Sequence, residues 1–411
     1  MPFELPNSWV WCRLEDIAYV ASGSTPDKTC FVENGVPYIK MYNLRNQKID
    51  FAYHPQYITE EVHNGKLQRS RTEVGDLIMN IVGPPLGKLA IIPTTLPQAN
   101  FNQAAVLIRP YKFKEVLVSY LKVYLEEMSE INSIATRGSA GQVNISLTQS
   151  QNMRIPIPPL NEVRRIIEEV SKYDILIDSL KQNITDIQNL IAYTKSKILD
   201  LAIHGKLVPQ DPNDEPAIEL LKRINPDFTP CDNGHYENLP SGWAMCKLSD
   251  LCRIENGFAF SSNDYKTQGI PLVRISNIIH NTIDITDCAY IEGVTDNKFK
   301  ISKGDLLIAM SGATTGKMGV YPFDETAYLN QRVGNIKILN KSLLSPDYRN
   351  TYMQSKVDEI LKIAYGGAQP NISASVIGNF DFPLPPYKEQ IRIVETVQRI
   401  FGQLDVITES L

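Results

Sequence analysis

The feature that most constrains the fold of this chain is an internal repeat. Five segments of the first half return in the same order in the second half, at offsets that drift from 234 to 227 residues. The matched pairs are LPNSWVWCRLEDIA (5–18) with LPSGWAMCKLSDLC (239–252), GVPYIKMYNL (35–44) with GIPLVRISNI (269–278), GDLIMNIVGPPLGKLAII (75–92) with GDLLIAMSGATTGKMGVY (304–321), FNQAAVLIRP (101–110) with LNQRVGNIKI (329–338), and IPIPPLNEVRRI (155–166) with FPLPPYKEQIRI (382–393). Surface loops change length more readily than the elements they join, which accounts for the drift. The chain is therefore predicted to be two copies of one module.

Each copy has the pattern of a globular domain built from short strands. Runs rich in Val, Ile, Leu and Tyr are separated by Gly, Pro and Asn, and one helical stretch follows in each copy. This pattern predicts an α+β fold with a twisted, mostly antiparallel sheet in each half. The predicted boundaries are 1–158 for the first globular domain, 159–204 for a long central helix, 205–237 for a linker, 238–385 for the second globular domain and 386–411 for a shorter C-terminal helix.

A helical seam follows each Pro-Pro pair. Apolar or aromatic residues recur there at alternating steps of four and three, the spacing of a coiled coil, with Thr194 as the one polar exception. The seam residues are Ile166, Val170, Tyr173, Ile177, Leu180, Ile184, Ile187, Ile191, Ile198 and Leu201 in the first helix, and Ile393, Val397, Ile400, Leu404, Ile407 and Leu411 in the second. We expect the two helices to pack antiparallel, in keeping with a pseudo-two-fold repeat. Because the second seam is shorter, part of the first seam is expected to lack a partner in the second helix and to pack against another surface.

Charge and cysteine usage narrow the class of protein only partly. The formal net charge is −5, but residues 1–160 carry 15 basic against 14 acidic residues and residues 238–386 carry 14 against 14. A neutral domain can still present one basic face to phosphates, so nucleic-acid binding is neither required nor excluded. The six cysteines lack CxxC or Cys/His metal spacing, which predicts reduced thiols and no metal. No membrane span or signal-peptide pattern is present, so we expect a cytoplasmic protein.

Two glycine-rich turns resemble phosphate-binding loops without matching them. GPPLGK (83–88) and GATTGK (312–317) have three residues between the glycines, where a nucleotide-binding loop has four, and neither lysine is followed by Ser or Thr. ATP binding is therefore not expected. Two interpretations remain open: a plain hairpin turn, or a turn whose backbone N–H groups and lysine approach a DNA phosphate. The histidines show no catalytic or metal spacing, and we assign no catalytic residue.

Polar residues that recur in matched loops are the candidate DNA contacts. Asn and Gln pair with adenine, and Arg and Lys with guanine, in the major groove. The candidates are Ser24, Lys28, Lys40, Asn43, Lys88, Gln103, Arg137, Gln142, Ser261, Arg274, Asn277, Thr314, Lys317, Gln331, Arg332 and Gln369. The repeated asparagines could instead hold turns through bonds to the backbone. Residues 23–31 and 257–266 differ between the copies, which would give the two halves different preferences.

Taken together, these motifs resemble the specificity (S) subunits of Type I restriction–modification systems. The telling elements are L-P-x-x-W-x-x-x-x-L-x-D at the start of each module, G-D-L followed by G-x-x-x-G-K, and the closing P-L-P-P-x-x-E-Q-x-x-I. The first closing motif departs from the pattern, because Val163 stands where Gln is usual. The run HGKLVPQ (204–210) is also typical of the family.

The resemblance implies a function without catalysis in this chain. Each globular half would be a target recognition domain that reads a few base pairs of double-stranded DNA. The paired helices would fix the gap between the half-sites and dock two methyltransferase (M) subunits, and restriction (R) subunits would join that core. S-adenosylmethionine, ATP and Mg would belong to those partners, with no cofactor in this chain. Because the halves differ, the target would be asymmetric and interrupted.

Other interpretations of the same sequence stay open. The chain could serve a Type IIB system, whose partner both methylates and cuts DNA. It could be a silent or truncated cassette for recombination, which would not bind DNA. It could also be a self-sufficient enzyme with an unrecognised site, which would methylate or cut DNA unaided.

Overall fold

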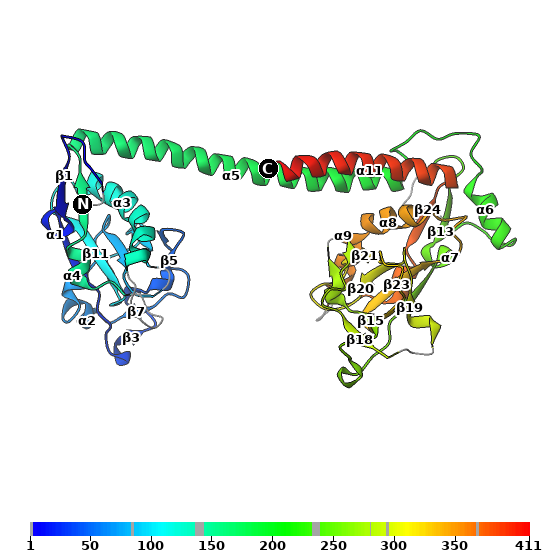
Figure 1. The fold of residues 1–411 in the computed structure, drawn as a ribbon, viewed down its shortest axis with the longest axis horizontal. Coiled ribbons are helices and arrows are strands. Elements are labelled where there is room, and N and C mark those ends of the chain that lie inside the picture. Colours follow the sequence, from blue (N-terminus) through cyan, green and yellow to red (C-terminus); the bar gives the residue numbers. More distant parts are fainter. Residues whose placement is uncertain are drawn as a thin grey trace. The chain divides into compact units, whose positions relative to one another are not determined.

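The computed structural model describes residues 3–83, 86–135, 144–231, 239–279, 281–292, 296–366 and 370–411. The chain divides into two compact units, Met1–Lys181 and Gln182–Leu411, and each holds one copy of the repeated module (Figure 1). The first unit contains the beginning of the long helix α5 (Leu160–Ile203), and the second contains its end together with α11 (Tyr387–Glu409).

The first unit contains two four-stranded sheets and two two-stranded ladders. One sheet has the order β2-β11-β8-β9 and is antiparallel throughout; the other has the order β10-β4-β7-β3, with β10 and β4 parallel. The strands are β1 (Val10–Arg13), β2 (Ala18–Ser22), β3 (Phe31–Val32), β4 (Val36–Ile39), β5 (Leu44–Arg45), β6 (Lys48–Ile49), β7 (Tyr57–Ile58), β8 (Leu77–Asn80), β9 (Leu89–Ile91), β10 (Asn100–Phe101), β11 (Ala105–Pro110) and β12 (Arg154–Ile157). The helices are α1 (Leu14–Ile17), α2 (Glu60–Asn64), α3 (Lys114–Ala135) and α4 (Leu147–Gln151), before α5.

The second unit repeats this plan. Its larger sheet has the order β14-β23-β20-β21-β17-β16 and its smaller sheet β18-β15-β22-β19, with β15 and β22 parallel. The strands are β13 (Ala244–Lys247), β14 (Cys252–Asn256), β15 (Ile270–Val273), β16 (Ile278–Ile279), β17 (Thr282–Ile283), β18 (Ala289–Ile291), β19 (Lys300–Ile301), β20 (Leu306–Ala309), β21 (Met318–Val320), β22 (Ala327–Leu329), β23 (Val333–Ile338) and β24 (Asp381–Leu384). The helices are α6 (Ala217–Ile224), α7 (Leu248–Leu251), α8 (Pro346–Ser355), α9 (Val357–Ala364) and α10 (Ala374–Gly378). The prediction of an α+β module with mostly antiparallel strands is confirmed.

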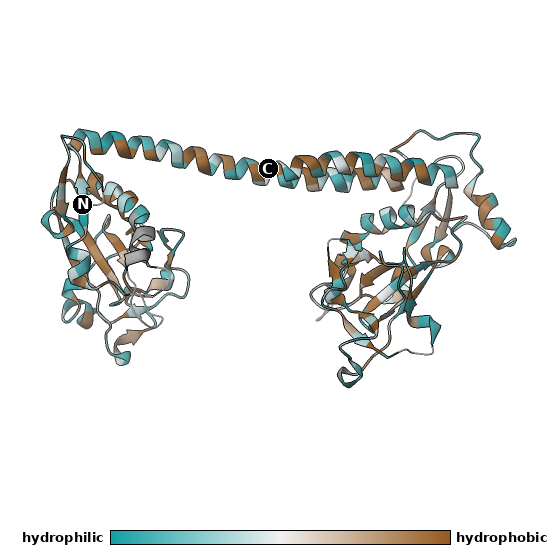
Figure 2. Cartoon of the chain, in the orientation of Figure 1, coloured by the Kyte–Doolittle hydropathy of each residue, from teal (hydrophilic) through white to brown (hydrophobic). Residues whose placement is uncertain are grey.

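The central strands are apolar on both faces because each face covers a separate core. In β11, Val106 and Ile108 join the cluster beneath α3, whereas Leu107 belongs to the cluster on the other face. In the second unit, Leu306 and Leu307 divide between two clusters in the same way. Alternate side chains of a strand point to opposite faces, so a continuous apolar run is what a strand covered on both sides requires. Figure 2 shows these strands as largely hydrophobic.

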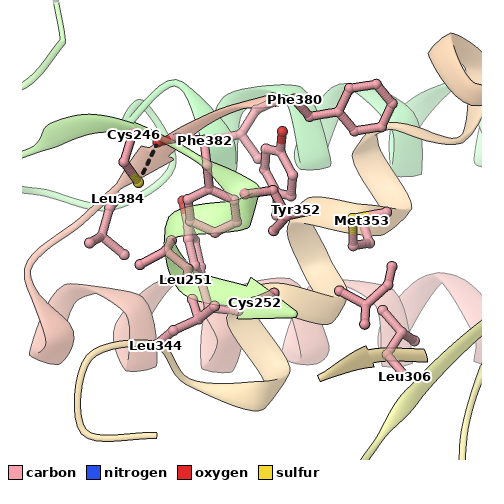
Figure 3. Packing of buried hydrophobic residues seen from close by; sticks show 14 of the residues in the cluster. Cys246, Leu251, Cys252, Leu306, Leu344, Tyr352, Met353, Phe380, Phe382 and Leu384 are labelled. Carbon is pink, nitrogen blue, oxygen red and sulfur yellow. Dashed lines mark hydrogen bonds between the residues drawn. The ribbon is translucent and has the colours of Figure 1, made fainter. Parts of the chain in front are cut away.

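The second unit closes its module with a dense aromatic contact. The ring of Tyr352 on α8 lies 4.2 Å from that of Phe382 on β24, measured between centroids, and Figure 3 shows both among buried aliphatic residues. Strand β13 pairs antiparallel with β24, so the start of the module is joined to its end. The same closure occurs in the first unit, where β1 pairs with β12. The start and the closing motif of each module therefore form one ladder.

Within the second unit, α11 runs antiparallel along the end of α5 (Figure 1). Ile198 of α5 shares a core cluster with Ile393 and Val397 of α11, and Lys195 forms an ion pair with Asp405. The connector between the modules also bonds to α11, because Arg392 Nη2 donates to Asp214 Oδ2 at 2.6 Å.

The predicted seam is buried over only part of its length. Ile191, Ile198, Ile393 and Val397 are buried. Ile166, Val170, Ile184, Leu201, Ile400 and Leu404 are half-buried. Tyr173, Ile177, Leu180, Ile187, Ile407 and Leu411 are exposed. The buried seam residues lie in the second unit, whereas Ile166 packs against the core of the first unit. Residues 171–183 of α5 are exposed throughout. Among the described residues, none of the helices is long and apolar enough to cross a membrane.

Candidate nucleic-acid interface

The loops that carry the candidate contacts of the first unit meet at one place. The backbone N–H of Ser24 donates to the carbonyl of Phe101 at 3.1 Å, and that of Asn102 donates to the carbonyl of Ile39 at 3.1 Å. The N–H of Ile81 donates to the carbonyl of Ala104 at 2.8 Å. The turns after β2, β4, β8 and β10 are therefore tied together. We call residues 23–28, 40–43, 81–83 and 102–104 loop cluster A.

The second unit repeats these bonds at matching positions. The N–H of Phe258 donates to the carbonyl of Leu329 at 2.9 Å, and that of Asn330 donates to the carbonyl of Val273 at 3.0 Å. The N–H of Met310 donates to the carbonyl of Arg332 at 2.9 Å. We call residues 257–264, 274–277, 310–317 and 329–332 loop cluster B. The repeat in the sequence is thus a repeat in the hydrogen-bonded framework of these loops.

One glycine in each cluster is required by this framework. A Cβ atom on Gly23 would overlap the carbonyl oxygen of Asn102, and one on Gly257 would overlap that of Asn330. Because glycine alone lacks a Cβ, no other residue allows the two backbones to approach so closely. The glycines fix the position of the residue that follows each of them.

The repeated asparagines hold their loops from inside, which corrects the interpretation of Asn43 and Asn277 as DNA contacts. Asn43 Oδ1 accepts from the N–H of Lys40 at 2.9 Å, and Asn43 Nδ2 donates to the carbonyl of Asp50 at 3.1 Å. Asn277 Oδ1 accepts from the N–H of Arg274 at 2.9 Å in the same way. Both side chains are buried. Their side-chain amides bond to backbone groups, which fits the alternative interpretation that these asparagines stabilise turns.

The glycine-rich turns are hairpins. Strands β8 and β9 pair antiparallel around the first turn, and β20 and β21 around the second. In the second turn the N–H of Gly316 donates to Ala309 at 2.9 Å and that of Lys317 donates to Thr314 at 3.0 Å. These two N–H groups bond within the hairpin, which favours the interpretation as a plain turn at these positions. The lysine side chains stay candidates: Lys317 is exposed and Lys88 half-buried.

Lys40 and Arg274 occupy equivalent positions above aromatic rings. Lys40 Nζ lies 5.5 Å from the centroid of Phe31, and the guanidinium carbon of Arg274 lies 5.8 Å from that of Tyr265. Arg274 Nε is buried and has no hydrogen-bond partner within the described part of the chain. A buried donor without a partner costs free energy, so this nitrogen is a candidate for a ligand contact.

The other candidates differ in exposure. Lys28, Gln103, Ser261, Gln331 and Arg332 are exposed, whereas Ser24 and Thr314 are half-buried. Arg137, Gln142 and Gln369 lie outside the described residues.

The match to known proteins covers nearly the whole chain. The family model for the Type I restriction modification DNA specificity domain matches residues 6–189 and 240–411. The chain belongs to this family. Two family members are the EcoAI specificity subunit of Escherichia coli, at 26% identity over 97% of this chain and 78% of the relative, and the EcoKI specificity subunit of Escherichia coli K12, at 22% over 99% and 85%.

Solved structures show the same fold. A chain from a study of the assembly and conformational transition of the type I R-M system superposes with a TM-score of 0.65 at 19% identity, covering 100% of this chain and 94% of that one. The HsdS subunit from Thermoanaerobacter tengcongensis gives a TM-score of 0.57 at 18% identity, covering 100% and 93%. The two-module architecture is therefore the fold of this family.

Two residues of the candidate interface could not be identified from the repeated polar positions of the sequence. Arg69 is exposed, and its Nη2 donates to Ser24 Oγ at 2.9 Å, which adds a cation to loop cluster A. Phe258 is an exposed aromatic residue in loop cluster B. Phe258 lies within the segment 257–266 that differs between the copies, so that difference was a usable signal. Arg69 can be recognised as a repeated cation only when the two modules are aligned on their G-D-L motifs, which matches it with Lys298.

Proposed function

We propose that this chain is the DNA-recognition subunit of a Type I restriction–modification complex, in which loop clusters A and B each read one half of an asymmetric, interrupted site. The observation that carries the proposal is the repeated loop framework with different side chains at its tips. The framework bonds of Ser24 and Phe258 match, whereas their side chains are a hydroxyl and an aromatic ring. Phosphate contacts position a protein on a duplex, and contacts to base edges specify the sequence.

The long helix would set the gap between the half-sites and dock two M subunits. Two readers held at a fixed spacing gain affinity through effective concentration, and only on a site whose gap fits. Helix α5 is continuous over Leu160–Ile203, roughly 65 Å at 1.5 Å per residue. Its exposed apolar residues, among them Tyr173 and Leu176, support a role in contacting a partner. Apolar residues grouped on a helix surface are typical of a protein interface.

The chemistry of modification and restriction would belong to the partner subunits. In this proposal the chain contributes binding and spacing in the cytoplasm, the M subunits bring S-adenosylmethionine, and the R subunits bring ATP and Mg. Purified chain alone should then neither methylate nor cut DNA, and either activity would contradict this division of roles.

Methylation mapping tests the proposal directly. Genomic DNA is sequenced for methyladenine from cells that express the chain with its neighbouring methyltransferase gene, and from cells that lack the chain. A new motif with two different half-sites and a fixed gap is the expected result. No new motif, with both proteins present and soluble, would overturn the proposal in favour of a silent subunit.

A further inference from the structure

Ser24 and Phe258 occupy the same place in the two modules. Each follows a glycine whose backbone lies against the loop after β10 or β22. Each donates its backbone N–H to the carbonyl of the last residue of that strand, Phe101 or Leu329. The position is held by the same bonds in both copies, while its side chain changes from a small polar group to a large apolar ring.

The neighbours of these two residues have changed with them. Aligned on Gly75 and Gly304, Arg69 corresponds to Lys298 and the residue after each is Ser70 or Phe299. In loop cluster A, Ser24 Oγ accepts a hydrogen bond from Arg69. In loop cluster B, the Phe258 ring packs on Phe299 at 5.4 Å between centroids. The side chain that the residue after the glycine contacts in this segment is therefore a cation in the first module and, one aligned position later, an aromatic ring in the second.

The Phe258 ring is held in place although it is exposed. It contacts Phe260 edge-on at 5.0 Å as well as Phe299, and both of these rings are packed against the buried core of the smaller sheet. Phe258 itself is 46% exposed. A single exposed apolar side chain is ordinary on a protein surface. This one is braced by two rings among the candidate DNA contacts, and the N–H of Gln331 donates to its carbonyl at 2.9 Å.

Building on the proposed function, we infer that Phe258 reads a thymine in the half-site bound by the second module, through an apolar contact with the 5-methyl group. That methyl is the apolar group that a base pair presents in the major groove, and Phe is among the side chains suited to it. A preorganised ring loses little conformational freedom on contact. The corresponding position of the first module is polar, with Ser24 and Arg69, so the first half-site has no matching methyl contact there.

The experiment removes the methyl group from the DNA instead of altering the protein. Once the site is mapped, each thymine of the second half-site is replaced in turn by deoxyuridine, and the affinity of the chain in complex with its M subunits is measured. At one position the affinity should fall about fourfold, as expected for one buried methyl group. Phe258→Ser introduces the side chain of Ser24, the equivalent residue of loop cluster A. This variant should bind the thymine duplex and the deoxyuridine duplex equally.

A matched control separates this contact from general damage. Leu339 is 54% exposed and follows β23 at the end opposite Gln331, so Leu339→Ser should keep the full preference for thymine over deoxyuridine. The inference is overturned if no replacement in the second half-site weakens the wild-type complex, or if Phe258→Ser keeps the preference. Failure of the proposed function looks different, because the wild-type complex would then bind the mapped site no better than a scrambled duplex.

Discussion

Shortening α5 within its exposed stretch should move the preferred gap of the target site. Residues 171–177 are all exposed, and they lie apart from the packed end of the helix. Deleting these seven residues therefore removes few tertiary contacts. It also returns the rest of the helix to nearly the same face, because seven residues make almost two turns at 3.6 residues per turn.

The size of the effect follows from helix and duplex geometry. Seven residues correspond to about 10 Å of helix, which is about three base pairs at about 3.4 Å per step. The preferred gap should therefore shorten by about three base pairs, while the bases of both half-sites stay the same. Three base pairs also turn the duplex by about 100°, so the best site of the variant should be weaker than that of the wild type. At the original gap, affinity should fall roughly 10²- to 10⁴-fold, because the second half-site is no longer reached.

A library of duplexes with the mapped half-sites and variable gaps provides the assay. The complex methylates the library, and sequencing gives the extent of methylation at each gap. A double substitution, Lys172→Ala with Asp174→Ala, changes two exposed polar residues of the deleted stretch but keeps its length and its apolar residues, so its preferred gap should be that of the wild type. An unchanged gap in the deletion variant would refute the reasoning, because α5 would then not set the spacing.

Three further predictions concern single side chains. Lys317→Ala should lower the slope of log affinity against log salt by about 0.9 and weaken specific and scrambled duplexes alike, as measured by anisotropy; an altered base preference would contradict the phosphate contact. Ile393→Ala should reduce the free energy of unfolding by about 2–5 kcal/mol because Ile393 is buried, whereas exposed Ile407→Ala should change it by less than about 0.5 kcal/mol; equal losses in urea denaturation would contradict this. Burial raises the pKa of Glu389 above 4.5, so the carboxyl keeps its proton to higher pH in the folded state, and stability falls as the pH rises from 4.5 towards the folded pKa. Glu389→Gln should flatten that fall; urea midpoints that change equally with pH in the wild type and the variant would contradict it.

The sequence predicted those parts of the fold that depend on local pattern. The runs LIMN (77–80) and AVLI (105–108) predicted strands, and both are central strands of the antiparallel four-stranded sheet of the first unit. The seam predicted antiparallel packing, which occurs in the second unit, where Ile198 and Val397 belong to one buried cluster. Periodicity along one segment carries this information because it records which face of an element is buried.

The candidate interface could be predicted only in part, because its geometry depends on residues far apart in the chain. Asn43 and Gln103 are both repeated polar residues in loops, yet one is buried and bonded inside its loop and the other is exposed. Repetition alone does not separate a residue that shapes a loop from one that the loop presents. The bond between Arg69 and Ser24 spans 45 residues, and no periodic pattern marks it.

The architecture separates the residues that shape the interface from those that can vary. Gly257 and the backbone bonds around it belong to the framework, and substituting this glycine would force two backbones apart. The side chain of Phe258 contacts other rings at the tip of the loop, and its equivalent in the first module is serine on the same framework. An exchange at this position therefore changes what the loop presents without changing the bonds that hold it. Because both copies keep the framework and differ at the tip, a duplicated module of this kind can acquire two different half-site preferences while each copy keeps its fold.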